Sequence, residues 1–161
     1  MKIEILKNKK KAVAIGKFIT SKAAFEQTWT PDEKRRVQEA PLESLTNPLH
    51  QYWYIEDKGQ IVGAIGINEN KYKNLGFEMD NDYVAIHKKY RREGLGSKLL
   101  QKAERFVKMK KGRYIHILSC DIKSYKPARI FFVKNGYKQV ANIPNYYVTG
   151  EGRIDYIKTF I

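Results

Sequence analysis

The residues with the clearest chemical potential form a basic loop that ends in two closely spaced glycines. Two lysines and two arginines between positions 88 and 92 precede Gly94 and Gly96, where a helical pattern begins. Cations at a helix start are electrostatically unfavourable, because the helix N-terminus already carries about half a positive charge and unpaired N–H groups. A bound anion removes that conflict, and glycine lets backbone donors approach phosphate oxygens closely. The stretch therefore predicts a polyphosphate site.

Two common phosphate motifs do not fit this loop. No stretch has the Walker A arrangement of glycine, four residues, then Gly-Lys-Ser/Thr. The Rossmann fingerprint requires a third glycine three residues after the second, where this chain has Leu99. The flanking elements must therefore decide what kind of phosphate the loop binds.

The loop is expected between a strand and an amphipathic helix. A strand is predicted over 77–87, in which the carboxylates Glu78, Asp80 and Asp82 point to one side by the period of two. Acids are poor strand formers, so the alternative is a turn at 80–82, and we favour the strand. After Gly94 the apolar residues recur with helical spacing as far as Val107, and Gly112 closes this helix.

The rest of the chain alternates helical and strand patterns. Thr30 and Pro31 give a clear helix start signal, and a Gly-containing turn predicts a hairpin at 51–68. The predicted order is a strand at 1–6, a charged turn at 8–11, helices at 12–25 and from 30 to about 41, a loop at 41–50, hairpin strands at 51–56 and 60–68, a strand at 114–118, a helix from 124 to 136, a strand at 137–141, a Tyr-rich loop at 144–152 and a strand at 154–160. Such a mixture predicts one mixed α/β sheet with helices packed on it.

Composition indicates one basic globular domain covering 1–161. Of the 161 residues, 42% are hydrophobic and 12% aromatic, which supplies a packed core and argues against disorder. The net charge of +14 favours polyanionic partners such as nucleotides or nucleic acid. Because the lysines are spread along the whole chain, the other interpretation is a general gain in solubility.

Cysteine usage and hydropathy predict a cytoplasmic protein. The single Cys120 excludes an internal disulfide, and the N-terminus lacks the apolar region of a secretory signal. No run approaches the length of a membrane span, so no membrane partner is expected. We also expect no metal site.

Two segments resemble the GNAT acetyltransferase superfamily, whose members use acetyl-coenzyme A (acetyl-CoA) as the acetyl donor. The segment Tyr83–Leu100 resembles the family's apolar strand, (Gln/Arg)-x-x-Gly-x-(Gly/Ala) loop and helix. The segment Ala128–Tyr137 resembles its second motif, an Ala, two aromatics and a Lys-x-Gly-aromatic ending. The resemblance covers about 51–161 and implies an α/β (α+β) fold, with a mostly antiparallel central sheet of about six to seven strands and about four helices. The first fifty residues would shape the acceptor site.

The resemblance also implies which residues hold the donor. Backbone groups of the strand would pair with the pantetheine arm like an added strand. The amides of the glycine loop would wrap the pyrophosphate. The resulting acetyl-CoA set is Val84, Ala85, Ile86, Arg91, Arg92, Glu93, Gly94, Leu95, Gly96, Ser97, Tyr125 and Phe132. The Val84 amide would meet the developing oxyanion, as in relatives.

Acetyl transfer to an amine needs a proton acceptor, because an alkylamine with a pKa near 10 is an ammonium ion at neutral pH. A carboxylate can act through water. Some relatives carry a glutamate at the position of Asp80, which is therefore our catalytic candidate. The alternative is that Asp80 and Asp82 are exposed carboxylates that balance nearby lysines.

The chain departs from the family pattern at three positions. The tyrosine that often protonates the leaving thiolate is Phe132, which cannot donate a proton. The usual asparagine before the second motif is Tyr125, and the strand position where some relatives carry a glutamate is Cys120. Tyr125, Tyr146 or Tyr147 could supply a proton instead, and we choose Tyr147 as the second catalytic candidate; packing is the alternative role for each. Cys120 is expected to be a small buried hydrophobe.

The sequence thus predicts an N-acetyltransferase that acts on a primary amine of a small molecule or peptide by direct attack on the thioester. The alternative is a basic protein that binds nucleic acid, or acetylates an RNA-linked acceptor, with the same fold. Nucleic acid is not the favoured partner. The protein is expected to be a monomer or homodimer.

Overall fold

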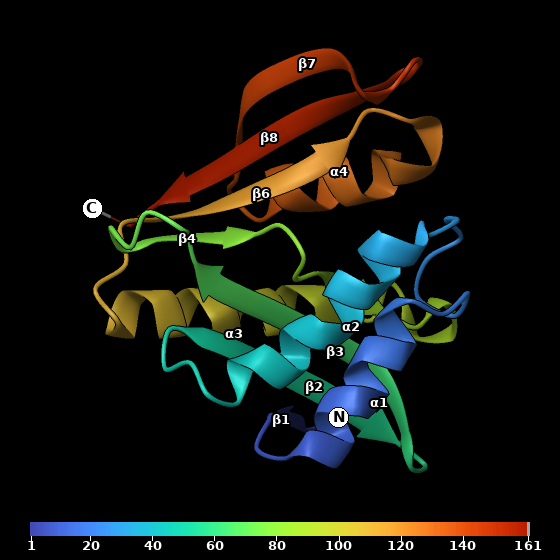
Figure 1. The fold of residues 1–161 in the computed structure, drawn as a ribbon, viewed down its shortest axis with the longest axis vertical. Helices are drawn as coiled ribbons and strands as arrows, with labels where there is room; N and C mark the ends of the chain where they lie inside the picture. The colour runs from blue at the N-terminus through green and yellow to red at the C-terminus, as the bar shows by residue number, and fades with distance from the viewer. Residues whose placement is uncertain (161) are drawn as a thin grey trace.

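The computed structural model describes residues 1–160 and places them in one sheet with helices on both faces (Figure 1). The predicted domain of 1–161 ends at Ile161, which lies outside the described residues. The elements are β1 (Ile3–Ile5), α1 (Lys9–Ile19), α2 (Pro31–Ser44), β2 (His50–Asp57), β3 (Gln60–Glu69), β4 (Gly76–Met79), β5 (Val84–Ile86), α3 (Leu95–Met109), β6 (Tyr114–Cys120), α4 (Lys126–Lys134), β7 (Lys138–Val148) and β8 (Glu151–Thr159), with short 3-10 turns at Lys88–Tyr90 and Lys123–Tyr125.

The described chain forms an eight-stranded sheet in the order β1-β2-β3-β4-β6-β8-β7, and β5 pairs with β3 off this path. The β4–β6 pair is parallel and the other pairs are antiparallel. The predicted mixed, mostly antiparallel sheet is therefore confirmed. β3 pairs with β4 near its end and with β5 near its middle, so β4 and β5 are two pieces of one interrupted strand.

Two apolar cores cover the two faces of the sheet. One contains the apolar stripe of α3 together with Phe77, Ile115 and Phe132. The other packs α1 and α2 against Tyr52, Tyr54 and neighbouring residues of β2 and β3. In Figure 1, α1 and α2 cross in front of β2 and β3, and no helix of residues 1–160 covers the same face of β4, β6 and β8. This uncovered part of the sheet lies beside β5.

The two N-terminal helices differ from their predicted bounds. α1 begins at Lys9, because the Asn8 side chain accepts a hydrogen bond from the Lys11 amide at 2.9 Å, so the predicted charged turn is instead the first helical turn. The helix ends at Ile19 rather than at residue 25. α2 continues through Pro41 to Ser44, so the predicted helix end and loop at 41–50 are wrong there.

The predicted start of α2 is confirmed, and the contribution of its cap to the free energy of unfolding can be measured. Thr30 Oγ1 accepts from the Glu33 amide at 3.2 Å, and Pro31 occupies the first turn. We expect Thr30→Ala to lower the free energy of unfolding by about 1 kcal/mol, because a helix amide loses its capping partner. Urea unfolding measures the change. Thr28→Ala is the control, since Thr28 is exposed and caps no helix; equal losses in both variants would contradict the capping role.

The hairpin is confirmed, whereas the strand predicted over 77–87 is wrong. β2 and β3 are joined by Lys58 and Gly59, both with positive φ. The chain bends at Asp80 and Asn81, so β4 stops at Met79 and β5 starts at Val84. The turn that we considered as the alternative is therefore closer to the structure.

The Tyr-rich loop predicted over 144–152 is also wrong. β7 extends to Val148, and Gly150, with a φ of 87°, turns the chain into β8. Its register with β8 jumps between Ile143 and Val148, so the outer part of the strand is irregular. This end of the hairpin lies at the same end of the sheet as the C-terminus of β6, because Cys120 pairs with Arg153.

Candidate active site

β5 presents one hydrogen-bonding edge that no described strand occupies. His87 N–H donates to Val62 O at 2.8 Å and Gly66 N–H donates to Tyr83 O at 3.2 Å, with Ala85 opposite Ala64 between them. In an antiparallel ladder the hydrogen-bonded pairs alternate, so the peptide groups of Ala85 face β3. Those of Val84 and Ile86 therefore face away from β3, into the gap between β5 and β6.

A run of unpaired backbone donors follows β5. None of the N–H groups from Arg91 to Ser97 has a hydrogen-bond partner within residues 1–160. Gly94 is the N-cap of α3, with a φ of 76° and no capping side chain, and the first turn of the helix holds no acidic residue. Helix starts normally satisfy these donors with a side chain, water or a ligand. The amides here can donate hydrogen bonds to an anion that the described chain does not itself supply.

The two glycines of the loop keep this surface free of side chains. A Cβ on Gly94 would meet no described atom within 4 Å, so the backbone there is open to a ligand. A Cβ on Gly96 would lie 3.2 Å from Cε2 of Phe131. Phe131 therefore forms the wall opposite Gly96, a position that we did not predict. Its neighbour Phe132, which we did predict for the donor site, is buried in the core beside Tyr137 and Tyr156.

Only part of the positive charge of the loop is free to act on a ligand. Arg91 donates from Nε to Ile86 O at 3.1 Å and from its guanidinium to Ala24 O, so it ties the loop to the segment after α1. Lys88 Nζ pairs with Glu26 Oε1 at 3.0 Å. Lys89 and Arg92 are exposed, and Arg92 has a φ of 65°, which is uncommon for a residue other than glycine. The main role of Arg91 is thus to hold the loop in place through these hydrogen bonds.

Aromatic side chains line the other side of β5. The rings of Phe25 and Trp29, from the segment between α1 and α2, lie 5.4 Å and 5.6 Å from that of Tyr83. Burial raises the pKa of Tyr83, with smaller contributions from Tyr125, Glu33, Asp80 and Tyr147. These groups therefore lie near enough to Tyr83 for their charges to act on it, and they come from the 3-10 turn before α4, α2, the bend after β4 and β7.

Tyr125 and Tyr147, which we predicted for the site, both lie near Tyr83. Burial raises the pKa of each phenol to about 12, so both are protonated at neutral pH and can donate a proton. Tyr147 Oη donates to Ser119 O at 3.2 Å, and this bond holds the phenol beside the end of β6. Burial also raises the pKa of the Cys120 thiol, which agrees with its expected role as a small buried side chain.

The two aspartates after β4 have different environments. Asp80 is exposed at the bend and makes no hydrogen bond or ion pair within the described residues. Asp82 is buried, and its carboxylate accepts hydrogen bonds from Tyr52 Oη, His50 Nε2 at 2.9 Å and Asn68 Nδ2 at 3.5 Å. The alternative that both are exposed lysine partners is therefore wrong for Asp82. Asp82 instead fixes the bend that separates β4 from β5.

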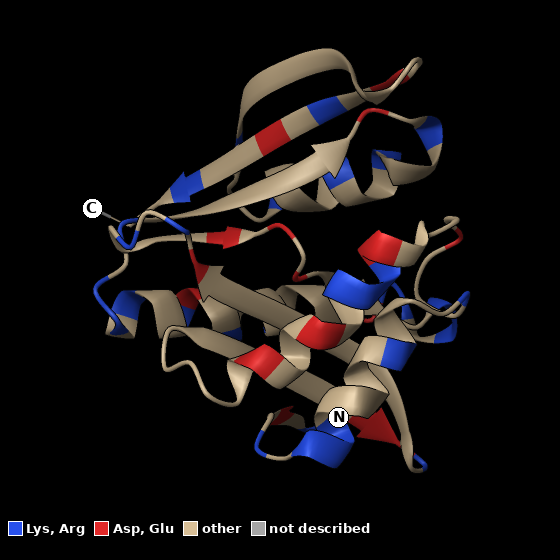
Figure 2. Cartoon of the chain, viewed as in Figure 1, with Lys and Arg blue, Asp and Glu red and all other residues tan. Residues whose placement is uncertain are grey.

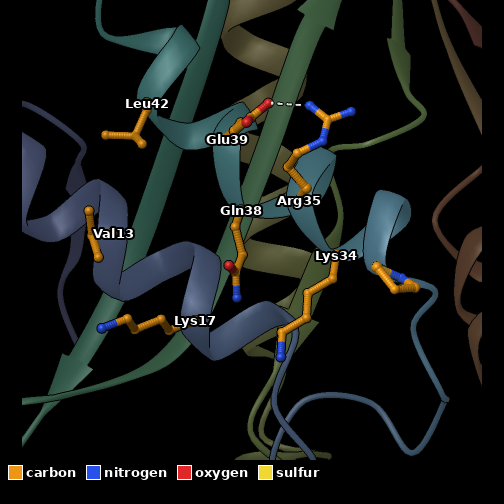
Figure 3. A pocket seen from close by; sticks show the side chains of 8 residues that line it. Val13, Lys17, Lys34, Arg35, Gln38, Glu39 and Leu42 are labelled. Carbon is orange, nitrogen blue, oxygen red and sulfur yellow. Dashed lines mark hydrogen bonds and ion pairs between the residues drawn. The ribbon is translucent and has the colours of Figure 1, made fainter.

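Two surface hollows lie away from β5. A groove of about 480 Å³ runs between α1 and α2 and is lined by residues of these helices (Figure 3). In Figure 3 the Arg35 guanidinium pairs with Glu39, while Lys17 and Lys34 point to its rim. A second hollow of about 570 Å³ lies against α4 and Tyr156. Neither includes a predicted site residue. Residues 1–160 contain no cluster of metal-ligating side chains and no helix able to span a membrane.

Comparison with known proteins agrees with this geometry. Residues 48–139, more than half of the chain, match the family model of the acetyltransferase (GNAT) domain. No curated protein is similar enough to the chain to count as a match.

Solved structures of similar fold cover nearly the whole chain. One from Desulfovibrio desulfuricans, described as a GNAT-family acetyltransferase, has a TM-score of 0.83 and 18% identity, with 98% of each chain covered. The aminoglycoside 6'-N-acetyltransferase from Enterococcus faecium has a TM-score of 0.74 and 20% identity over 100% of this chain and 98% of its own. The ribosomal-protein-S18-alanine N-acetyltransferase from Escherichia coli has a TM-score of 0.72 and 12% identity over 98% and 94%. At these identities the likeness shows the fold.

Proposed function

The chain belongs to the GNAT acetyltransferase family, and on that premise we propose that it transfers the acetyl group of acetyl-CoA to a primary amine of a small molecule or peptide. The observation that supports the proposal is that two sets of unpaired backbone groups follow one another along the chain. The free edge of β5 is followed, after the 3-10 turn at Lys88–Tyr90, by the unpaired amides at the start of α3. One surface suits an amide-bearing chain and the other suits a phosphate group.

The residues present fit acetyl-CoA. Val84 and Ile86 offer peptide groups on the free edge for the pantetheine amides, except that Ile86 O is engaged by Arg91. The amides from Arg92 to Ser97 offer donors for the pyrophosphate. Ala85 faces β3 and Phe132 lies in the core, so neither is retained as a direct contact. A solved aminoglycoside 6'-N-acetyltransferase of this fold carries coenzyme A, which supports the same donor here.

Acetyl transfer requires one group to take a proton from the amine and another to return a proton to the leaving thiolate. Acetyl-CoA supplies an activated acetyl group and a thiol leaving group with a pKa of about 8.5. The Val84 N–H remains available for the acetyl carbonyl oxygen, as a donor in a partly desolvated gap. Tyr147 and Tyr125 keep protonated phenols near the end of β6 and are candidates to return a proton to the thiolate. The amine loses its proton to a carboxylate on the acceptor side.

The acceptor itself is expected to enter between α2 and the β7–β8 hairpin. Structural neighbours are named for aminoglycosides and for the alanine of a ribosomal protein, so both small molecules and peptides belong in the assay panel. The test measures free thiol release from acetyl-CoA with each amine, alongside calorimetric titration of acetyl-CoA into the protein. Micromolar binding with amine-dependent thiol release is the expected outcome. Absence of acetyl-CoA binding would sink the proposal.

Gly96→Val tests the proposed donor site. A branched side chain at the first turn of α3 would press against Phe131 and cover the amides, so we expect acetyl-CoA affinity to fall by about tenfold or more, at least 1.4 kcal/mol. Calorimetry of both proteins measures the loss. Gln101→Val introduces the same side chain at an exposed position further along α3 and should bind normally. Equal affinities in wild type and Gly96→Val would contradict the assigned phosphate contacts.

A further inference from the structure

Six cations gather at the corner of the molecule where α3 ends and where β4 and β6 begin. They come from two stretches that are distant in the sequence, the loop before β4 and the turn that joins α3 to β6. All six are exposed or half-exposed, and we call them the basic corner: Lys71, Lys73, Lys108, Lys110, Lys111 and Arg113. Figure 2 shows blue segments in the loop before β4 and at the end of α3, beside the C-terminus. The fold thus brings together cations from separate parts of the chain.

Hydrogen bonds fix the two stretches of the basic corner to one another. Arg113 Nε donates to Asn74 O at 2.9 Å, and the Arg113 amide donates to Leu75 O at 2.8 Å. From the same loop, Asn70 Nδ2 donates to Tyr114 Oη of β6 at 2.9 Å. The cations are therefore carried by connected segments of the fold and not by a loose tail.

Aromatic rings take the place of carboxylates beside these cations. Segments 70–77 and 105–120 contain no acidic residue, and Lys73 is the one member of the basic corner with an ion pair in residues 1–160, at 4.0 Å from Glu69. Four of the cations lie over a ring, 5.2 Å to 5.6 Å from its centre: Lys71 over Tyr72, Lys108 over Phe160, Lys110 over Phe106 and Arg113 over Tyr114. A ring face attracts a cation without neutralising it, so the positive charge stays available to an anion.

The dipole of α3 accounts for only part of this charge. The partial negative charge at a helix C-terminus stabilises nearby cations, which applies to Lys108 and Lys110. Lys71 and Lys73 belong to another loop, and Arg113 lies beyond the helix end. In a protein of net charge +14, bringing further cations together adds repulsion. A bound polyanion would offset that repulsion.

Tyr72 gives the basic corner a second means of binding. Its side chain is 73% exposed, the highest value for a large hydrophobic residue in the described chain, and the Tyr72 amide donates to Asn70 Oδ1 at 3.0 Å. Proteins that bind single-stranded nucleic acid combine cations for the phosphates with aromatic faces on which bases stack. The two stretches expose two aliphatic side chains, Leu75 and Met109, whereas a lipid surface requires a broad apolar face. The combination therefore favours nucleic acid over a membrane.

We propose that the basic corner binds a single-stranded nucleic acid, with a base stacked on Tyr72 and phosphates in contact with the cations. This binding does not depend on acetyl transfer. Because α3 has 15 residues, the basic corner lies about 22 Å along the helix axis from the glycine loop. A strand bound at the basic corner leaves the proposed acetyl-CoA site open.

Fluorescence anisotropy with labelled oligouridylate and oligodeoxythymidylate, each of about twelve nucleotides, tests the proposal. We expect a Kd of about 1–100 µM, with log affinity falling linearly with log salt by about 0.7 for each phosphate contacted. Binding of either probe in this range supports the proposal, and the ratio of the two affinities distinguishes RNA from DNA as the ligand. Absence of binding to both probes overturns it.

A charge-reversal variant locates the binding surface. Lys110→Glu/Lys111→Glu should lower affinity about tenfold or more and reduce the salt slope by about 1.4, because two phosphate contacts are lost. Lys9→Glu/Lys10→Glu is the matched control, since it changes the net charge equally at two exposed positions of α1, away from the basic corner (Figure 1). Salt screens charges beyond about 10 Å, so the control should bind within about twofold of wild type. Equal losses in both variants would show that net charge alone drives binding and would overturn the proposal.

Tyr72→Ala separates stacking from charge. It should lower affinity about fivefold or more at an unchanged salt slope, whereas Tyr72→Phe keeps the ring and should bind like wild type. Urea unfolding and acetyl-CoA affinity should not change in either variant, because Tyr72 is exposed and distant from the glycine loop. Unchanged oligonucleotide affinity in Tyr72→Ala would contradict the stacking role.

Phosphatidylserine vesicles and polyglutamate are the comparison probes, because they offer negative charge without bases. We expect both to bind more weakly than the oligonucleotides and to be insensitive to Tyr72→Ala. Binding of either comparison probe as tight as that of the oligonucleotides would overturn the assignment to nucleic acid. A failure to bind acetyl-CoA, by contrast, bears on the proposed function alone.

Discussion

Val84→Pro is expected to lower kcat by about 10²–10³-fold, as loss of one preorganised oxyanion donor does in other acyl-transfer enzymes. Proline removes a single N–H group and nothing else from the backbone hydrogen-bonding set. At Val84 that group faces the free edge of β5, so no bond to β3 is lost. The variant therefore separates donor chemistry from sheet stability, which side-chain substitutions at this position cannot do.

Ala85→Pro is the matched control for this experiment. Its N–H belongs to the hydrogen-bonded pair with Ala64, so proline there removes a ladder bond in the middle of the sheet. We expect Ala85→Pro to unfold at markedly lower urea concentration, and Val84→Pro to unfold close to wild type. Steady-state thiol release and urea unfolding of both variants provide the comparison. A Val84→Pro enzyme that turns over normally would show that the edge amide does not contact the reacting carbonyl.

Local signals explain why the glycine loop, the helix α3 and the start of α2 were predictable from sequence. The glycine loop, the helical stripe of α3 and the cap at Thr30 are each specified by residues a few positions apart. The start of α3 also depends on what is missing, since neither an acidic residue nor a capping side chain follows Gly94. Such features are visible in a short window of the chain.

Long-range contacts explain why the bend after β4 and the outer part of β7 were not predicted from sequence. The break between β4 and β5 depends on Asp82 reaching Tyr52 and His50, which lie about thirty residues earlier in the chain. The outer part of β7 contacts neighbouring strands through Tyr146 and Tyr147, which bind Arg153 and Ser119. A Tyr-rich stretch with a proline carries no local sign of that pairing. The carboxylates between 78 and 82 could be named from sequence, but which of them is buried could not.

The basic side chains of the loop are likewise engaged by residues distant in the sequence. Sequence reasoning assigned Arg91 to phosphate, whereas its guanidinium is committed to Ile86 O and Ala24 O. Lys88 is committed to Glu26. These ties fix the loop against β5 and the segment after α1, so charge that looked available for binding is used to hold the backbone donors in place. Under the proposed function, this loop would bind the anion more through its amides than through side-chain charge.

Asp82→Ala is expected to lower the free energy of unfolding by about 3 kcal/mol, because it leaves several buried donors without an acceptor. Tyr52 Oη and His50 Nε2 both point at this carboxylate, and burial raises the pKa of Tyr52, which keeps its phenol protonated as a donor. Urea unfolding measures the loss. Activity should fall as well, since the bend that Asp82 holds sets the position of Val84.

Tyr52→Phe gives a reference value for the free energy of unfolding lost in Asp82→Ala. It removes one donor and leaves the carboxylate bound to His50 and Asn68, so about 1 kcal/mol is expected. The difference between the two variants measures how much the carboxylate contributes beyond a single bond. If Asp82→Ala were no more destabilising than Tyr52→Phe, the hydrogen bonds of Asp82 would not hold the bend. The separation of β4 from β5 would then have to come from a contact with α2. In that contact Arg36 Nη1 donates to Asn81 Oδ1 at 3.1 Å. Arg36→Ala would then be the variant that closes the free edge of β5.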